Sequence, residues 1–243
     1  MDRWLNPFFY DREWKGLVRG CTPVSEGCRN CYARDIHGWL RRMGVRGYVG
    51  REFSQVEWRR EALRHPRWRG SHQVMVGNMF DLFHERVPFE FISEVFDVIR
   101  AHPQHRYLVL SKRTERMVEF AGTYGWAENA WAGTSVESRA VLGRIDDLRQ
   151  IPPEKRFLSV EPLLEDLGQL NLEDIQWVVC GGESGENARP FKHDWARSLR
   201  DRCVEAGVAF YFKQRDRPKR RAPHSLPVLD GRTWVERPEG LPW

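Results

Sequence analysis

The regular alternation of short apolar runs with amphipathic stretches most constrains the fold of this chain. Short apolar runs are typical of buried strands, and apolar residues at helical spacing indicate helices. The predicted strands lie at 72–79, 105–113, 129–136, 155–163, 175–184 and 208–214. The predicted helices lie between them, at 88–101, 114–121, 137–151 and 193–207. Strands separated by helix-length segments predict parallel βαβ units.

A first strand near residues 16–20 and a helix at about 31–44 bring the total to roughly seven βα units. About 250 residues are typical of a (β/α)8 barrel, and this chain has 243. We therefore expect an α/β fold built as a parallel (β/α) barrel, complete or partial, with about six to eight strands. A doubly wound open sheet is the alternative.

The expected barrel forms a single domain over residues 1–214. It carries a cysteine-containing loop at 20–33 and an insertion at 45–70 that is rich in arginine and tryptophan. Residues 215–243 are basic and proline-rich, which predicts an extended tail that packs on the barrel or projects from it.

The composition is that of a globular protein, with 41% hydrophobic and 30% charged residues. No stretch approaches the roughly 18 consecutive apolar residues of a membrane span, and the N-terminus lacks the apolar run of a secretory signal. We therefore expect a cytoplasmic protein with no membrane partner, whose cysteines stay reduced. The net charge of +5 is compatible with an anionic partner, and the excess of arginine is also typical of a GC-rich genome.

Three cysteines lie close together in the segment GCTPVSEGCRNCYA, with the spacing C-x6-C-x2-C: Cys21, Cys28 and Cys31. Three thiolates and one open position suit a [4Fe–4S] cluster whose fourth iron is free for another ligand. A structural zinc site needs a fourth protein ligand, for which His37 is the candidate. The loop position and the lack of a fourth cysteine nearby favour the cluster. The other two cysteines are expected to be buried small hydrophobes: Cys180 and Cys203.

Polar residues follow almost every predicted strand. In a barrel the carboxyl ends of the strands meet at one rim, where the chemistry of such folds takes place. These residues are Asn78, Asp81, Ser111, Lys112, Arg113, Thr134, Ser135, Glu137, Ser159, Glu161, Gly181, Gly182, Glu183, Ser184, Lys213 and Gln214. We therefore expect a polar ligand site at this rim. Thr134, Ser135 and Glu137 have an alternative interpretation as helix caps or loop residues.

Eight segments, in order from about residue 14 to the end, carry a family resemblance: GCTPVSEGCRNCYA, NMFDLFHERVP, VLSKRTERM, WAGTSVES, RFLSVEPLL, WVVCGGESGENARP, FYFKQ and LDGRTW. A barrel with a three-cysteine loop after its first strand resembles the radical S-adenosylmethionine (radical SAM) superfamily. More closely, these segments resemble an uncharacterised family of that type that is encoded by phages and bacteria.

The resemblance implies that Cys21, Cys28 and Cys31 bind a [4Fe–4S] cluster and that the amine and carboxylate of SAM chelate its open iron. Reduction would cleave the sulfonium and give a 5′-deoxyadenosyl radical, which abstracts a hydrogen atom from the substrate. A reductant protein such as flavodoxin or ferredoxin would supply the electron. If the chain is phage-encoded, its compartment would be the host cytoplasm.

This sequence departs from the superfamily in two places. The superfamily spaces its cysteines C-x3-C-x2-C and has an aromatic residue before the last one, whereas here the first gap is six, Asn30 precedes Cys31 and Tyr32 follows it. The segment GGES at 181–184 is similar to the motif that binds the SAM amine, but it follows the sixth predicted strand rather than the second.

Our first hypothesis is a radical SAM enzyme that modifies or repairs a nucleic-acid base or nucleotide, with DNA, RNA or a free nucleotide as substrate. The expected catalytic residues are Asp81, Lys112 and Lys213. The expected cofactor-binding residues are Tyr32, Asn78, Ser135, Glu161, Gly181, Gly182, Glu183 and Ser184. The expected substrate-binding residues are Arg113 and Gln214. Lysine and arginine at such positions suit phosphate or carboxylate groups.

Two alternatives remain open from the sequence. One is a zinc-stabilised nucleic-acid-binding protein without catalysis, with His37 as the fourth ligand, in which the basic tail contacts phosphates. Its contact residues would be Arg215, Arg217, Lys219, Arg220 and Arg221, with Trp58 and Trp68 either stacked on bases or packed in the protein. The other is a metal-independent hydrolase that uses Glu161 and Glu183 as an acid–base pair.

Overall fold

The computed structural model describes residues 12–13, 16–63, 69–152, 155–184, 187–215, 226–239 and 241. Its centre is a parallel sheet of seven strands in the order β1-β4-β5-β6-β7-β8-β9. These strands are β1 (Arg12–Glu13), β4 (Gln73–Val76), β5 (Arg106–Ser111), β6 (Ala130–Ser135), β7 (Arg156–Val160), β8 (Trp177–Gly181) and β9 (Ala209–Gln214).

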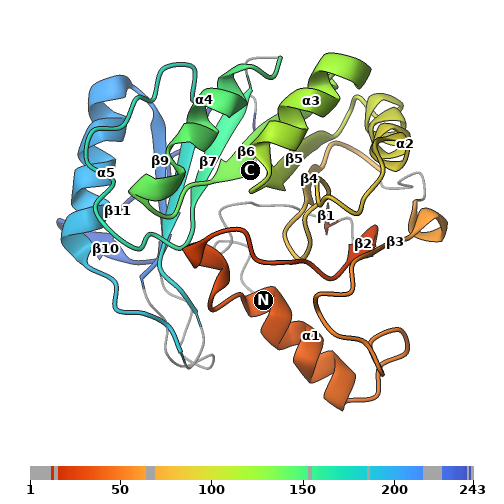
Figure 1. The fold of residues 1–243 in the computed structure, drawn as a ribbon. Helices are drawn as coiled ribbons and strands as arrows, with labels where there is room; N and C mark the ends of the chain where they lie inside the picture. Colours follow the sequence, from red (N-terminus) through yellow and green to blue (C-terminus); the bar gives the residue numbers. More distant parts are fainter. Residues whose placement is uncertain are drawn as a thin grey trace.

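From β5 to β9 each strand pairs with its predecessor in the chain, and the sheet curls into a half-barrel (Figure 1). A doubly wound sheet would instead reverse its strand order partway along. The prediction of a partial parallel (β/α) barrel is therefore confirmed, and the doubly wound alternative is wrong.

Four helices cover the outer face of the half-barrel (Figure 1). They are α2 (Phe89–Arg100), α3 (Thr114–Tyr124), α4 (Gly143–Arg149) and α5 (His193–Ala206). Each of the four carries a buried apolar stripe, and α2 begins directly after Pro88, whose fixed φ suits a helix start. The helix predicted over 137–151 is shorter than expected, because a 3-10 turn, η4 (Arg139–Val141), comes before α4.

Side chains alternate between the two faces of the sheet, as the period of a strand requires. Along β5, Tyr107 and Val109 pack toward the helices, whereas Leu108 packs on the inner face. The inner face is filled near the amino ends of the strands by a cluster of large side chains: Met75, Leu108, Trp131, Phe157, Trp177, Val179, Tyr211 and Leu241. At Gly133 a Cβ would overlap the Phe157 ring, so any larger residue at this inward position would have to displace that ring.

The predicted first strand does not belong to the barrel. Residues 18–19 form β2 (Val18–Arg19), which pairs antiparallel with β3 (Glu57–Trp58) in a separate two-stranded sheet. Gly20 follows with φ +79°, and a Cβ there would lie 2.5 Å from the Phe53 carbonyl oxygen. This close approach allows the chain of the 45–70 insertion to return to β2 and pair with it as β3. A 3-10 turn, η3 (Arg60–Ala62), follows β3. The edge strand beside β4 is β1 instead.

The helix α1 (Tyr32–Arg42) stands apart from the four helices of the outer layer (Figure 1). The sequence predicted a helix at 31–44 as part of a barrel unit, but α1 begins at the cysteine loop, beside the carboxyl ends of the strands. Only Ala33 and His37 of α1 are buried. It therefore extends the rim of the half-barrel rather than its wall.

The described part of the C-terminal segment packs along the last strand. It contains the hairpin of β10 (Val228–Leu229) and β11 (Arg232–Thr233), and Val235 then bridges antiparallel to Tyr211 of β9. The Phe212 amide donates to the Trp234 carbonyl at 2.9 Å, so this edge of the sheet is paired. Among the described residues, no helix combines the length and apolarity needed to cross a membrane.

Candidate functional site

A cavity of about 350 Å³ lies where the cysteine loop, residues 20–33, meets the carboxyl ends of the strands. Fifteen of the sixteen residues predicted to form the site line this cavity: Cys21, Cys28, Cys31, Tyr32, Asn78, Asp81, Lys112, Arg113, Ser135, Glu161, Gly182, Glu183, Ser184, Lys213 and Gln214. The remaining one, Gly181, lies inside β8. A Cβ on Gly181 would come within 2.9 Å of Glu161 Oε1, so this glycine makes room for the carboxylate.

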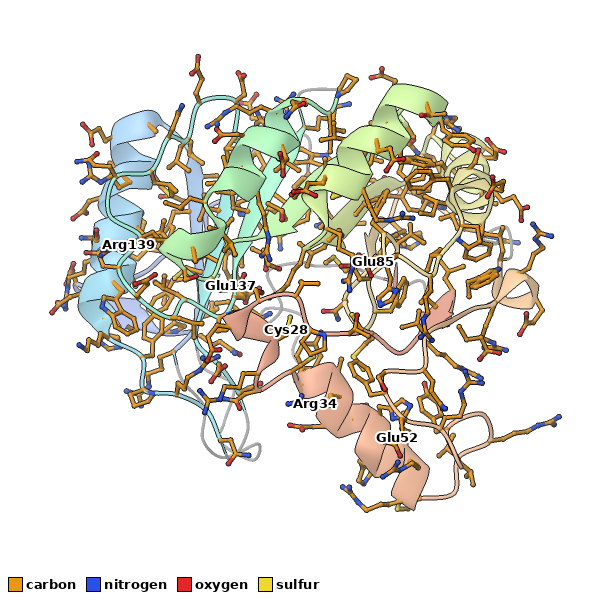
Figure 2. All side chains as sticks on the ribbon, in the orientation of Figure 1. Cys28, Arg34, Glu52, Glu85, Glu137 and Arg139 are labelled. Carbon is orange, nitrogen blue, oxygen red and sulfur yellow. The ribbon has the colours of Figure 1, made fainter. Side chains whose placement is uncertain are left out.

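The cysteine loop brings its three thiols to the same cavity. Each is half-buried, and all three are free thiols. The loop contains one 3-10 turn, η2 (Glu26–Cys28), and Cys31 directly precedes the first residue of α1. Figure 2 shows Cys28 where the loop passes the strand ends. Within the described ranges, no three His, Cys, Asp or Glu side chains are grouped closely enough to hold a metal ion.

Asp81 is a buried carboxylate of the cavity wall, and both of its oxygens are bonded. Its Oδ1 accepts from the Phe83 amide at 3.0 Å and from the Ser111 hydroxyl at 2.6 Å. Its Oδ2 pairs with Arg113 Nη1 at 2.9 Å, and both side chains are almost entirely buried. Burial and the charge of Asp81 raise the pKa of Cys21 to about 12, against the lowering effect of Arg113. The Cys21 thiol is therefore protonated at neutral pH.

Glu137, two residues after the end of β6, is completely buried and does not itself line the cavity. Lys112 Nζ lies 3.3 Å from Oε1, and Arg144 Nη1 lies 3.1 Å from Oε2. Burial opposes the ionisation of Glu137, but Lys112, the Ser25 hydroxyl and Arg144 together hold its pKa below the ordinary value. Figure 2 shows Glu137 beside the cysteine loop.

Glu183, which follows β8, is another buried carboxylate of the cavity lining. It pairs with Arg189, whose backbone amide and Nε donate to Oε2 at 2.8 and 3.1 Å. Burial would raise the pKa of Glu183, yet the hydrogen bonds from Arg189 and Asn30 hold it below the ordinary value. Across the cavity, Lys213 Nζ lies 2.9 Å from Glu161 Oε1, and the Ser159 hydroxyl donates to Glu161 Oε2 at 3.3 Å. Each charged strand end thus has a partner of opposite sign.

The cavity lining is not wholly charged. Tyr32 donates its hydroxyl to the Asn78 carbonyl at 2.6 Å, which ties the start of α1 to the loop after β4. Apolar side chains also line the cavity: Val24, Phe53, Met79, Phe80 and Leu110. The cavity therefore combines apolar side chains with ion-paired strand ends.

Several residues outside the cavity answer earlier expectations. Cys180 and Cys203 are fully buried, and burial raises the pKa of both. His37 does not line the cavity, since its ring packs edge-on against Tyr48 and Phe53 with centroids 5.2 and 5.5 Å away. Trp58 is exposed on β3. Of the proposed phosphate contacts Arg215 is exposed, and the others lie outside the described residues, as does Trp68: Arg217, Lys219, Arg220 and Arg221.

The site also contains residues that the sequence prediction did not include. Thr22, Ser25 and Asn30 sit between the cysteines, and Arg189 belongs to the WVVCGGESGENARP segment. Glu137 was noted only as a polar strand end with a capping alternative. The signal for these residues was present, because each lies in a motif that already carried the resemblance.

Comparison with known protein families finds one family model that matches residues 8–238, described as "Protein of unknown function (DUF5131)". The match covers nearly the whole chain, including the cysteine loop and every strand of the half-barrel. A comparison with curated proteins finds no match.

Proposed function

The chain belongs to the DUF5131 family of proteins of unknown function, and we propose that it is a radical SAM-type enzyme that acts on a nucleic-acid base or nucleotide. One observation carries the proposal. The three cysteines of a single loop line the same cavity as the polar ends of the strands of a parallel half-barrel. Fold alone does not assign function, so the argument rests on the donor set of this cavity.

The donor set suits a group that takes three thiolates and leaves one position facing the cavity. The carboxylates that share the cavity are already engaged by cations, Asp81 by Arg113 and Glu183 by Arg189. His37, the fourth ligand that a zinc site would need, packs against aromatic rings instead. When bound, a reduced [4Fe–4S] cluster would supply the electron that cleaves SAM into methionine and a 5′-deoxyadenosyl radical.

The chain's own residues would bind and orient the organic ligands. Lys112 and Lys213 both line the cavity and would hold a phosphate or carboxylate, each sharing its charge with one carboxylate partner. Glu161 and Ser135 offer a carboxylate and a hydroxyl for ribose or amine groups. The apolar side chains of Val24 and Phe53, which also line the cavity, would help to exclude water from the reacting atoms.

Two expected roles shift once the contacts are considered. Arg113 was expected to bind substrate, but its guanidinium is directed to Asp81, Glu85 and the cysteine loop. The substrate anion is therefore assigned to Lys112 and Lys213. Glu161 and Glu183, the acid–base pair of the hydrolase alternative, are each neutralised by a separate cation, which does not favour that alternative.

The test is the metal content and SAM chemistry of protein purified without oxygen. We expect about four iron and four sulfide per chain, with a broad absorption band of a thiolate-held cluster. With dithionite as the one-electron reductant, SAM should give methionine and 5′-deoxyadenosine, the radical taking its hydrogen atom from substrate or buffer. Cys28→Ala should lose both iron and 5′-deoxyadenosine, whereas Cys203→Ala, at a buried helix position, should keep both.

About one zinc per chain without iron or sulfide would overturn the proposal. So would a full cluster that yields no 5′-deoxyadenosine under reducing conditions. Addition of single nucleotides and short RNA or DNA to the reaction then identifies the substrate class, since the true substrate should increase the amount of 5′-deoxyadenosine formed.

A further inference from the structure

We infer that three strand ends of the half-barrel position the cysteine loop by one tether per cysteine, before any cofactor binds. The tethers are Arg113 after β5, Glu137 after β6 and Glu183 after β8. They make these three side chains positioning residues rather than ligands or substrate contacts. The inference rests on the proposed function for its purpose, but the tethers themselves are properties of this chain.

The first tether fixes Cys21. Arg113 has five N–H donors, and five acceptors account for them. Nε donates to Glu85 at 2.7 Å, and Nη1 donates to Asp81 at 2.9 Å and to Cys21 Sγ at 3.8 Å. Nη2 donates to both the carbonyl and the hydroxyl oxygen of Thr22 at 3.1 Å. The guanidinium is thus wholly committed to holding the start of the loop against the buried Asp81.

The second tether fixes the turn that carries Cys28. The Ser25 hydroxyl donates to Glu137 Oε1, and the same hydroxyl lies 3.9 Å from Cys28 Sγ. Gly27 lies directly on the Glu137 carboxylate, because a Cβ there would come within 2.8 Å of Glu137 Cδ. Glu137 cannot move away, since Lys112 and Arg144 hold its two oxygens. A completely buried carboxylate therefore fixes the position of this turn.

The third tether fixes Cys31. Asn30 Nδ2 donates to Glu183 Oε2 at 2.9 Å and to the Asn187 carbonyl at 2.8 Å. Arg189 completes the tether, because it pairs with Glu183 and also reaches back to Glu26, donating to its carboxylate at 2.8 Å and its carbonyl at 3.1 Å. The loop is therefore held on both sides of Cys28, by different strand ends.

The arrangement has a functional consequence. A free loop of this length would lose conformational entropy on binding a cluster, and a loop that is partly held in advance loses less. Outer partners of metal ligands commonly change metal affinity by roughly 10–100-fold when they are removed. We therefore expect each tether to contribute to cofactor retention through one cysteine.

Small substitutions within the loop test the tethers without removing a buried charge. The variants are Ser25→Ala for Cys28, Asn30→Ala for Cys31 and Thr22→Val for Cys21. Matched controls are Ser71→Ala and Asn171→Ala, which remove side-chain hydrogen bonds to Gln104 and Glu173 away from the cavity. Metal-free protein is labelled with iodoacetamide in its native state, and the rate at each cysteine is measured by peptide mass spectrometry.

Each loop variant should accelerate labelling at its own cysteine, with little change at the other two, and Ser25→Thr should restore the slow rate at Cys28. Ser71→Ala and Asn171→Ala should label like the wild type. Uniform acceleration at all three cysteines, or no acceleration, would overturn the inference. The unfolding temperature of each variant is measured as well, because it distinguishes a local release of the cysteine loop from a destabilisation of the whole protein.

Iron content distinguishes this inference from the proposed function. After anaerobic reconstitution, each loop variant should lose iron to a chelator roughly 10-fold faster than the wild type, if affinity falls through dissociation. If no protein in the series binds iron yet labelling is site-selective, the tethers stand and the proposed function fails. If the wild type binds four iron and the variants match it in both readouts, the function stands and the tethers fail.

Discussion

The buried pair of Arg113 and Asp81 makes a prediction whose size follows from the structure. Their side chains are only 5% and 8% exposed, and the pair is bonded at 2.9 Å. Removing one partner of such a pair strands the other charge in the interior, which costs about 3–5 kcal/mol. Arg113→Met should lower the free energy of unfolding by that amount. For a chain of this length, each kcal/mol corresponds to roughly 2–4 °C, so the unfolding temperature should fall by about 6–20 °C.

The second variant, Asp81→Asn, isolates the cause. The amide oxygen of asparagine can keep the hydrogen bonds that Oδ1 accepts from the Phe83 amide and the Ser111 hydroxyl. What it loses is the acceptor for Arg113 and for the Lys112 amide, which is 3.3 Å from Oδ2. The double variant Asp81→Asn/Arg113→Met removes both charges of the pair, so neither is left unpaired in the interior. It should therefore be more stable than Arg113→Met alone.

The assay is urea unfolding of metal-free protein at neutral pH, analysed as a double-mutant cycle. The reasoning predicts a coupling energy of at least about 1.5 kcal/mol, well above the additivity error of distant sites. If the double variant is as unstable as the sum of the two single variants, the stranded charge is not the cause. Arg113 would then stabilise the protein mainly through Glu85 and Thr22, its other partners.

Three further predictions follow from buried groups. The folded state holds the pKa of Glu137 below its ordinary value, so Glu137→Gln should destabilise the protein at pH 7, and the difference should shrink as pH falls below about 4.3; urea unfolding across pH, with the exposed Glu94→Gln as control, measures this. Burial, helped by His72 and His102, lowers the pKa of His105, so stability should fall as pH drops below about 6.5, and His105→Asn should flatten that dependence relative to His193→Gln. Gly133→Ala should cost about 1–3 kcal/mol by overlap with the Phe157 ring, whereas Gly122→Ala, on an open face of α3, should be neutral or stabilising; equal thermal shifts would contradict this.

The sequence predicted the six main strands and four outer helices well because each has a strong local signal. The strands β4 to β9 are short apolar runs buried on both faces, so their identity depends little on distant contacts. The helix α2 shows apolar residues at helical spacing directly after Pro88. Sequence alone could not decide whether the barrel closes, because closure depends on pairing between the first and last strands rather than on any local pattern.

The first predicted strand was wrong for a physical reason. Residues 16–20 include two buried apolar side chains, Leu17 and Val18, which fit a barrel strand equally well. Their actual partner is β3, a segment about forty residues away that was assigned to an insertion. The turn at Gly20 and the bond from the Cys21 amide to the Phe53 carbonyl decide this pairing, and neither is visible in the hydrophobic pattern.

The sequence indicated which residues lie near one another, but it did not indicate the contacts that each of them makes. The rule that parallel strand ends meet at one rim brought together residues from β4 to β9, and fifteen of the sixteen candidates do line one cavity. Roles depend on pairing, which the rule does not address. Arg113 and Glu183 looked like ligand contacts because they are charged strand ends, but each is paired within the protein and also bonds to the cysteine loop, Arg113 to Thr22 and Glu183 to Asn30.

The cysteine loop and the strand ends are joined by hydrogen bonds to buried charged residues. A charged residue at a strand end must find a counter-charge when it is buried, because an unpaired charge there is costly. In this chain the cysteine loop supplies some of the bonds that satisfy those residues, through Thr22, Ser25 and Asn30. The stability of the half-barrel rim and the geometry of the three thiols are therefore coupled. A change that loosens the loop should therefore lower the stability of the rim, and a change that loosens the rim should make the three thiols more accessible to iodoacetamide.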